Sequence, residues 1–298
     1  MRLTLVRHST VLVEMAGHRL IVDPMLDPPN ARGPVRGTPN GVPNPLVPLP
    51  MPIEEVIAGV DAVLLTHTHE DHIDAAGVLG LPRPLPWFCQ PEDLADLQPV
   101  GLTDMRPLAV GGPVEWEGIT ITRTGGRHGR EEAAIAGLGP VSGFVLTAAG
   151  EPTVYIAGDT VWCPEVEAAI AAHAPGVIVV NAGGARFLQG GTITMEAGDV
   201  VATAQAAPDA VVVPTHVEAI NHCLETRADL RAGVDAAGVG ERVRILADGE
   251  SLEACTPARD RSGLLAGGPT LRGAGSAARP APPGPSRRRP RRRRTPPA

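Results

Sequence analysis

Four side chains able to bind a metal ion are packed into residues 67–72, which read His-Thr-His-Glu-Asp-His directly after an apolar run. Imidazole and carboxylate groups are donors that suit Zn²⁺, Mn²⁺ or Fe. In an extended turn His67 and His69 point the same way, so both can bind one ion. Asp71 and His72 are expected at the start of a helix, within reach of a second ion, as in two-metal hydrolysis. The alternative is a solvated polar loop that binds no metal.

Three more candidate ligands, His128, Asp159 and His216, lie far from this segment in the chain but share one local pattern. Each follows an apolar run and then small or turn-forming residues. A single residue of this kind is more often structural, but its recurrence at successive predicted strand ends favours a shared site. Two divalent cations are therefore expected, Zn²⁺ first with Mn²⁺ or Fe as alternatives, and Asp71 and Asp159 would offset part of their charge.

Strands and helices must position these residues. Three β-rich runs before residue 24, separated by turn signals, predict an antiparallel meander. Beyond residue 52, apolar strands alternate with Ala-rich helical stretches, which favours a layered α/β or α+β domain with helices outside the sheets. The predicted strands are 3–7, 11–15, 19–23, 62–66, 119–124, 141–148, 153–157, 177–181, 211–215 and 243–247. The predicted helices are 71–79, 91–97, 164–173, 195–207 and 224–237.

Proline content and charge divide the chain into parts. Residues 23–52 contain ten prolines and predict a loop that covers something. All 26 basic residues are Arg, and ten of them follow Asp260, where no acid occurs. The predicted catalytic domain, 1–260, thus has 16 Arg against 33 acids, a net charge of −17. The Pro/Gly/Arg-rich tail, 261–298, is predicted to be disordered.

Composition excludes several function classes. Without Lys there is no Schiff-base chemistry and no Walker-type phosphate lysine. The four cysteines are scattered without a Cys-x-x-Cys pair, which argues against a disulfide framework and a thiolate metal site. No apolar run reaches membrane-spanning length and the N-terminus reads as a strand, so we expect a cytoplasmic protein with no membrane partner.

The chain resembles the metallo-β-lactamase superfamily of metallohydrolases from its first strands to about Glu253. The His-Thr-His-Glu-Asp-His block, the Arg-His-Gly segment, Gly-Asp-Thr and Pro-Thr-His carry the resemblance. It implies an α+β fold, the four-layer αββα sandwich, with a dinuclear site at one edge of the two sheets. It also implies that Asp159 bridges the ions, where a Cys would be typical of true β-lactamases. The chain is most similar to the branch that contains ascorbate-phosphate lactonase. By position, the implied first-metal ligands are His67, His69 and His128, and the second-metal ligands are Asp71, His72 and His216.

The residues and the resemblance together predict a dinuclear metal-dependent hydrolase. A metal-bound hydroxide would attack a small ester, lactone or phosphoester, because bound Zn²⁺ can lower the pKa of water to about 7. Asp71 could orient this hydroxide. His222, close to His216 in the chain, could donate a hydrogen bond or a proton to the substrate, or could merely neighbour a helix cap.

Two alternatives stay open. One is a metal-dependent nuclease or phosphodiesterase, in which the Arg-rich tail would contact phosphates, although the acidic body would repel a polyanion. The other is a non-catalytic, metal-stabilised binding module; a redox enzyme with one iron also occurs among the resembling proteins. A small-molecule substrate is the expected partner, nucleic acid is expected at most on the tail, and the oligomeric state is left open.

Several residues near the predicted ligands have two interpretations. Asp23 could hold a ligand imidazole or start a turn before Pro24, and Asp74 could do the same or begin a helix. His8, near a strand end, is left open in the same way as His222, between a role toward the substrate and a structural one. Arg127 and Arg186 could bind an anionic group of the substrate, or they could form surface salt bridges.

Overall fold

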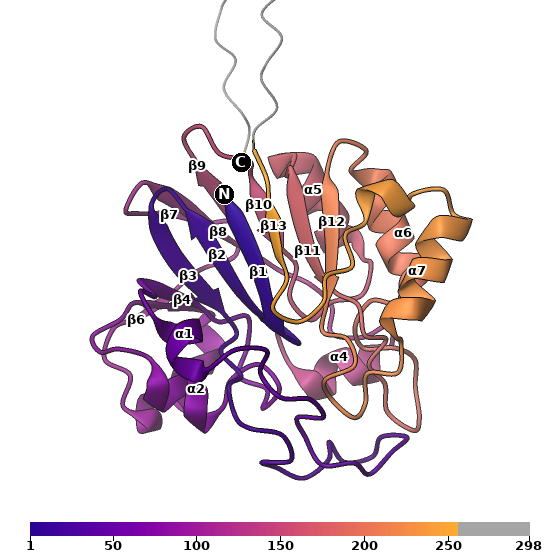
Figure 1. Ribbon diagram of the computed structural model, residues 1–298, viewed down its shortest axis with the longest axis horizontal. Helices are drawn as coiled ribbons and strands as arrows, with labels where there is room; N and C mark the ends of the chain where they lie inside the picture. The colour runs from indigo at the N-terminus through magenta and orange to yellow at the C-terminus, as the bar shows by residue number, and fades with distance from the viewer. Residues whose placement is uncertain (256–298) are drawn as a thin grey trace, which may run out of the picture. The chain divides into compact units, whose positions relative to one another are not determined.

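Two β-sheets form the centre of the structure, a computed structural model that describes residues 1–255 (Figure 1). The predicted tail, 261–298, lies outside the described residues. The seven-stranded sheet has the order β13-β1-β2-β3-β4-β5-β6, and the six-stranded sheet has the order β12-β11-β10-β9-β8-β7. The predicted layered α+β class is confirmed.

The first sheet begins with the predicted antiparallel meander: β1 (Arg2–Arg7), β2 (Thr10–Met15) and β3 (His18–Val22). Three short strands then continue the sheet in parallel: β4 (Ala62–Leu64), β5 (Trp87–Cys89) and β6 (Met105–Pro107). The last strand, β13 (Ser251–Glu253), returns to pair antiparallel with β1. Residues 65 onward therefore leave the sheet at the end of an internal strand.

The second sheet changes from antiparallel to parallel along its width. Its antiparallel part is β7 (Pro113–Trp116), β8 (Ile119–Thr124), β9 (Gly143–Ala148) and β10 (Val154–Ile156). Its parallel part continues from β10 to β11 (Val177–Asn181) and β12 (Val211–Thr215). Because parallel strands end at the same edge, the residues that follow β10 and β12 emerge at one edge of the sheet, on either side of β11.

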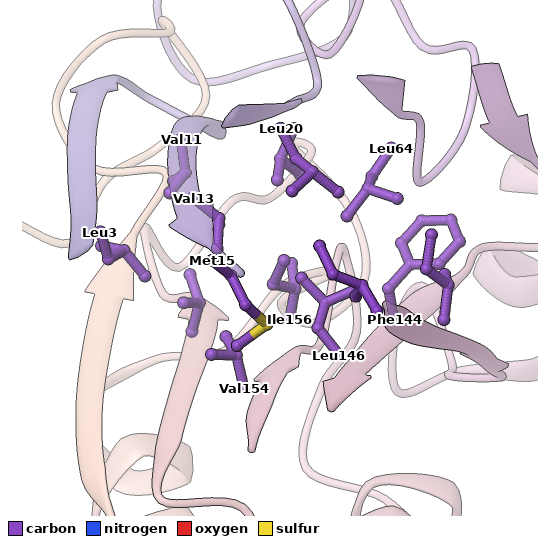
Figure 2. Packing of buried hydrophobic residues seen from close by; sticks show 14 of the residues in the cluster. Leu3, Val11, Val13, Met15, Leu20, Leu64, Phe144, Leu146, Val154 and Ile156 are labelled. Carbon is purple, nitrogen blue, oxygen red and sulfur yellow. The ribbon is translucent and has the colours of Figure 1, made fainter. Parts of the chain in front are cut away.

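Apolar side chains from both sheets fill the space between them. Leu3, Val13 and Leu64 of the first sheet point toward Phe144 and Ile156 of the second (Figure 2). All five are buried. Burying an aliphatic or aromatic side chain of this size contributes about 1.5–3 kcal/mol each, so this shared core holds the two sheets face to face.

Helices cover the outer face of each sheet. Outside the first sheet lie α1 (Ile53–Ile57), α2 (Ala75–Gly80) and α3 (Leu94–Leu97), which pack on a second apolar cluster. Outside the second sheet lie α5 (Pro164–His173), α6 (Ala197–Ala206) and α7 (Arg227–Ala236), which pack on a third cluster. The remaining helix is α4 (Glu132–Leu138). Two sheets between two helical layers confirm the predicted αββα sandwich. No helix in residues 1–255 has the length and apolarity required to cross a bilayer.

Some predicted elements are wrong in extent or type. The predicted helix 71–79 begins only at Ala75, because Asp74 caps it by accepting a hydrogen bond from the Gly77 amide at 2.8 Å. Asp71 and His72 therefore lie in the turn before the helix. The predicted strand 243–247 reduces to one isolated bridge between Val212 and Val243. The predicted helix 91–97 is a 3₁₀ turn, 91–93, followed by one turn of α-helix.

Candidate metal centre

The seven predicted ligands meet at one edge of the sandwich, where strands from both sheets end. The segment 67–72 follows β4 of the first sheet, whereas His128, Asp159 and His216 follow β8, β10 and β12 of the second. Gly158 precedes Asp159 with φ +69°, and a Cβ at this position would collide with the Ser142 carbonyl oxygen. Only glycine allows the backbone to pass this close to Ser142, so Gly158 helps to set the position of Asp159.

Three imidazoles converge in a first cluster. His67 Nε2 lies 2.9 Å from His69 Nδ1, and His128 Nε2 lies 3.3 Å from the same atom. The three candidate donor atoms all lie within 4.8 Å of one another. Nitrogen atoms this close can share one cation.

A second cluster consists of Asp71, His72 and His216, whose donor atoms also lie within 4.8 Å of one another. His216 Nε2 lies 3.5 Å from Asp71 Oδ2. Asp159 lies between the two clusters. Its Oδ2 is 3.2 Å from His72 Nε2 and 3.5 Å from His128 Nε2, and its Oδ1 is 3.5 Å from His216 Nε2. Asp159 thus contacts both clusters, as a bridging carboxylate would.

Each candidate ligand imidazole that directs Nε2 toward the centre has a partner at its other nitrogen. His72 Nδ1 lies 2.7 Å from Asp23 Oδ2, and His128 Nδ1 lies 2.9 Å from the Ile193 carbonyl oxygen. Carboxylate and carbonyl oxygens only accept, so both Nδ1 atoms carry the proton and both Nε2 atoms present a lone pair or, on an imidazolium, a proton. His67 Nδ1 contacts Thr66 Oγ1 at 3.0 Å, and His216 Nδ1 contacts Cys223 Sγ at 3.3 Å.

Orphaned buried atoms show that a cation fits this site. The Nε2 atoms of His72 and His216 are buried and have no hydrogen-bond partner among residues 1–255, although both face carboxylates. An unpartnered polar atom in the interior is costly. A donor set of five imidazoles and two carboxylates matches the preference of Zn²⁺, Mn²⁺ or Fe.

The two clusters hold protons differently in the metal-free protein. Burial lowers the pKa of His67 well below its usual range and that of His128 to about 4, so both are neutral at pH 7. Burial also acts on His72, but Asp159 and Asp23 outweigh it and raise the His72 pKa to about 10. Asp159 likewise outweighs burial at His216 and raises the pKa of that imidazole. His67 and His128 can therefore bind a cation without losing a proton, whereas His72 and His216 must first lose one each.

Asp23 contacts the imidazole of a candidate ligand, His72, in agreement with one of its two interpretations. Its backbone is left-handed, with φ 44°, which turns the carboxylate inward at the end of β3. Besides His72, it accepts hydrogen bonds from the Thr66 amide and the Thr66 hydroxyl, both at 2.8 Å. Asp74 instead caps α2, the other interpretation for that residue.

His8 lies closer to the site than the sequence showed. Its ring stacks on that of His216 with 3.6 Å between centroids, and its carbonyl accepts a hydrogen bond from the His216 amide at 2.8 Å. His8 Nε2 lies 3.5 Å from Asp71 Oδ2, and neither ring nitrogen has a hydrogen-bond partner among the described residues. His8 therefore contacts two members of the second cluster.

A cavity of about 590 Å³ opens onto the two clusters. His222 lines it and is buried, with Nε2 3.8 Å from Asp71 Oδ2. The prediction that His222 stands at a helix start is wrong, because α7 begins only at Arg227. The ligand segments contribute the lining residues His69, Glu70, Asp71, His128 and Asp159. The Pro-rich segment contributes Arg32, Gly33, Pro34, Val35, Arg36 and Asn44. The remaining lining residues are apolar: Leu138, Phe187 and Ile193.

The Pro-rich segment 23–52 forms no helix or strand, as predicted, and two buried polar residues hold it in place. Arg7 donates hydrogen bonds to the carbonyls of Met25, Asp27 and Val47 at 2.9–3.0 Å, near both ends of the segment. Asn221 bonds its middle part through Val35, Thr38, Asn40 and Asn44. Neither anchor was predicted, since each acts on residues far away in the sequence.

Arg127 and Arg186 form salt bridges. Arg127 Nε lies 3.0 Å from Glu165 Oε2, and Arg186 Nη2 lies 3.6 Å from Glu196 Oε2. Neither lines the cavity. The salt-bridge interpretation therefore describes both residues.

Comparison with known proteins adds the family. A family model described as "Beta-lactamase superfamily domain" matches residues 18–217. The chain belongs to the beta-lactamase superfamily. Among its superfamily relatives, the UPF0173 protein YddR of Bacillus subtilis (strain 168) is 34% identical, over 84% of this chain and 99% of that protein. A UPF0173 metal-dependent hydrolase of Methanopyrus kandleri is 26% identical, over 85% of this chain and 100% of its own.

Two solved structures resemble the chain closely. An isothiocyanate hydrolase from Delia radicum gut bacteria is 36% identical with a TM-score of 0.80, covering 86% of this chain and 100% of that one. A possible metal-dependent hydrolase from Veillonella parvula DSM 2008 is 31% identical with a TM-score of 0.81, covering 85% and 98%. The predictions of the superfamily and of a metal-dependent hydrolase are confirmed.

Proposed function

We propose that this superfamily member is a dinuclear metal-dependent hydrolase acting on a small molecule. The observation that supports it best is the position of Asp159, whose two oxygens lie 3.2–3.5 Å from imidazole nitrogens of both clusters. His67, His69 and His128 would hold one cation. Asp71, His72 and His216 would hold the other, and Asp159 would contact both.

Two bound divalent cations, Zn²⁺ in our proposal, would supply a water that ionises near neutral pH and a Lewis acid that polarises the substrate. The side chains supply the rest. Burial alone would raise the pKa of Asp71, but its Oδ2 lies 3.5 Å from both His216 Nε2 and His8 Nε2, and these imidazoles keep the pKa well below its usual range. Asp71 is thus an acceptor that can orient a proton-bearing group in the cavity.

His222 is proposed to exchange a proton or a hydrogen bond with the substrate. Burial lowers its pKa, so the imidazole is neutral at pH 7. Its Nδ1 is buried without a partner among residues 1–255. A neutral imidazole beside Asp71 can donate from one nitrogen and accept at the other, which suits a general acid or base.

The substrate is proposed to carry an electrophilic carbon or phosphorus in an ester, a lactone or a phosphoester. The similarity to an isothiocyanate hydrolase adds the isothiocyanate group, whose central carbon lies between nitrogen and sulfur. Addition of water there cleaves the C–N bond and yields an amine and carbonyl sulfide. The apolar side chains of Val35, Leu138, Phe187 and Ile193 in the cavity can hold the carbon skeleton.

Metal content and turnover test the proposal together. Elemental analysis should give two divalent ions per chain, and a panel of esters, lactones, phosphoesters and isothiocyanates should contain a substrate. Asp159→Ala should lower the metal content and reduce kcat by at least about 10³-fold, since both clusters lose their shared acceptor. Asp209→Ala, at an exposed turn, is the control. One ion per chain, or full turnover by the Asp159 variant, would contradict a dinuclear mechanism.

A further inference from the structure

Two arginines of the Pro-rich segment, Arg32 and Arg36, line the same cavity as the candidate ligands, but only Arg32 has side-chain partners among the residues that the structure describes. Arg32 lies 3.8 Å from an Asp27 oxygen and 3.9 Å from an Asp74 oxygen, and its Nη2 contacts Met25 Sδ at 2.9 Å. The Arg36 side chain, in contrast, makes no hydrogen bond or ion pair within residues 1–255. Arg36 is thus an exposed cation at the cavity, unpaired within the described part of the chain.

This lack of a partner is unusual around the site. Arg127, Arg130 and Arg186 each face a carboxylate, at 3.0, 2.6 and 3.6 Å. The body of the chain carries 33 acids against 16 arginines, so carboxylates are plentiful. A guanidinium left free beside a cavity keeps its planar fork of donors available for a carboxylate or phosphate group of a ligand.

The backbone on both sides of Arg36 is fixed. The Val35 amide donates to Asn221 Oδ1 at 3.0 Å, and the Val35 carbonyl accepts from the Thr38 hydroxyl at 2.6 Å. The Gly37 carbonyl accepts from the Leu188 amide at 2.7 Å. Arg36 therefore extends from an anchored turn, which reduces the entropy lost when its side chain binds a ligand.

We propose that Arg36 determines specificity by binding a compact oxyanion, carboxylate or phosphate, on a part of the substrate remote from the bond that is hydrolysed. The substrate class is then a small molecule with an electrophilic group, an apolar skeleton and an anionic end. The skeleton lies against Leu138, Phe187 and Ile193, which line the cavity together with Arg36. This inference rests on the proposed function for the position of the electrophilic group.

Binding of matched hydroxamates tests the inference without turnover. Three probes have the same chain length and the same metal-binding hydroxamate head, and end in a carboxylate, a phosphate or an uncharged carboxamide. Calorimetry gives the Kd of each for the metal-loaded wild-type protein, Arg36→Gln, Arg36→Lys and the control Arg231→Gln. The control removes the same charge from α7, away from the cavity.

The wild-type protein and the control should bind an anionic probe about tenfold or more tightly than the carboxamide, and Arg36→Gln should abolish this ratio. Arg36→Lys should retain part of it, because Lys keeps the charge but not the bidentate geometry. Whichever anion shows the larger ratio identifies the end group. Equal ratios in wild type and Arg36→Gln would overturn the inference. Selective binding without hydrolysis of any panel compound would instead contradict the proposed function and leave the anion site standing.

Discussion

Asn44 and Asn221 form two hydrogen bonds with each other, although 177 positions separate them in the sequence. The Asn44 side chain donates from Nδ2 to Asn221 Oδ1 at 2.8 Å, and the Asn221 backbone N–H donates to Asn44 Oδ1 at 2.9 Å. Asn221 Nδ2 also donates to the Thr38 hydroxyl and the Asn40 carbonyl. The buried Asn221 side chain thus connects the Pro-rich segment to the backbone next to His222, the following residue in the chain.

Asn221→Ala should release the middle of the Pro-rich segment. Several buried partners lose their hydrogen bonds at once, so the free energy of unfolding should fall by roughly 2–4 kcal/mol. Proteolysis within residues 30–44 should accelerate, and kcat/KM should fall on the order of tenfold or more. Asn30→Gly is the control, because that exposed side chain forms no hydrogen bond within residues 1–255 and its φ of 59° suits glycine. Wild-type proteolysis rates in the Ala variant would contradict this role.

His8→Phe should weaken binding of the cation at the second cluster more than binding of the cation at the first cluster. Phenylalanine keeps a ring against His216 but removes the nitrogen that lies 3.5 Å from Asp71. Loss of an outer partner of a metal ligand typically costs 10–100-fold in metal affinity. Metal content after dialysis should therefore fall from two toward one ion per chain, with unchanged circular dichroism. His18→Phe, at the start of β3 next to Trp116, is the matched control. Retention of both ions with wild-type affinity would refute the prediction.

Metal uptake should release protons, mainly at the second cluster. The His72 pKa is raised to about 10 and that of His216 is also raised, so both imidazoles are protonated in the metal-free protein at pH 7. A cation must displace these protons, and its affinity should fall as the pH falls, by up to about 100-fold per pH unit for two protons. Calorimetry in buffers of different ionisation enthalpy measures the number released. The first cation is the internal comparison, since His67 and His128 are already neutral. Equal proton release for both cations would contradict the assignment.

Asp93 should make the metal-free protein less stable as the pH rises. Burial raises its pKa to about 6, so the folded state holds this proton more tightly than the unfolded chain does. The stability is highest below the unfolded pKa and is lost as the pH rises through about 6. Asp93→Asn keeps the acceptor for Gln90 Nε2, 2.9 Å away, and removes the charge. Its unfolding free energy relative to wild type should increase by about 2–3 kcal/mol between pH 4 and pH 7.5. Chemical denaturation of both proteins at the two pH values measures this, and an unchanged difference would rule it out.

The sequence predicted the parts of the fold that have strong local patterns. The limits of α5, β8, β11 and β12 agree residue by residue, because α5 is Ala-rich, β8 alternates Ile with Thr at its start, and β11 and β12 begin with apolar runs. The strands that were missed, β5, β6, β7 and β13, have three or four residues each. Strands this short show no periodicity, and their pairing with a neighbouring strand decides their structure.

The candidate ligands could be predicted because each follows a strand end, and strand ends of a sandwich share an edge. The contacts of Arg7 and Asn221 and the position of Arg36 at the cavity could not be predicted, since they depend on how segments far apart in sequence meet. His8 shows the intermediate case. It follows β1 in the same way as the ligands follow their strands, but only the structure shows its stacking on His216.

Both sheets contribute to each cluster, because the 67–72 segment follows β4 whereas His128 and His216 follow strands of the second sheet. A chain emerging from the ribosome therefore lacks a complete second cluster until His216 has left the exit tunnel and the two sheets have packed against each other.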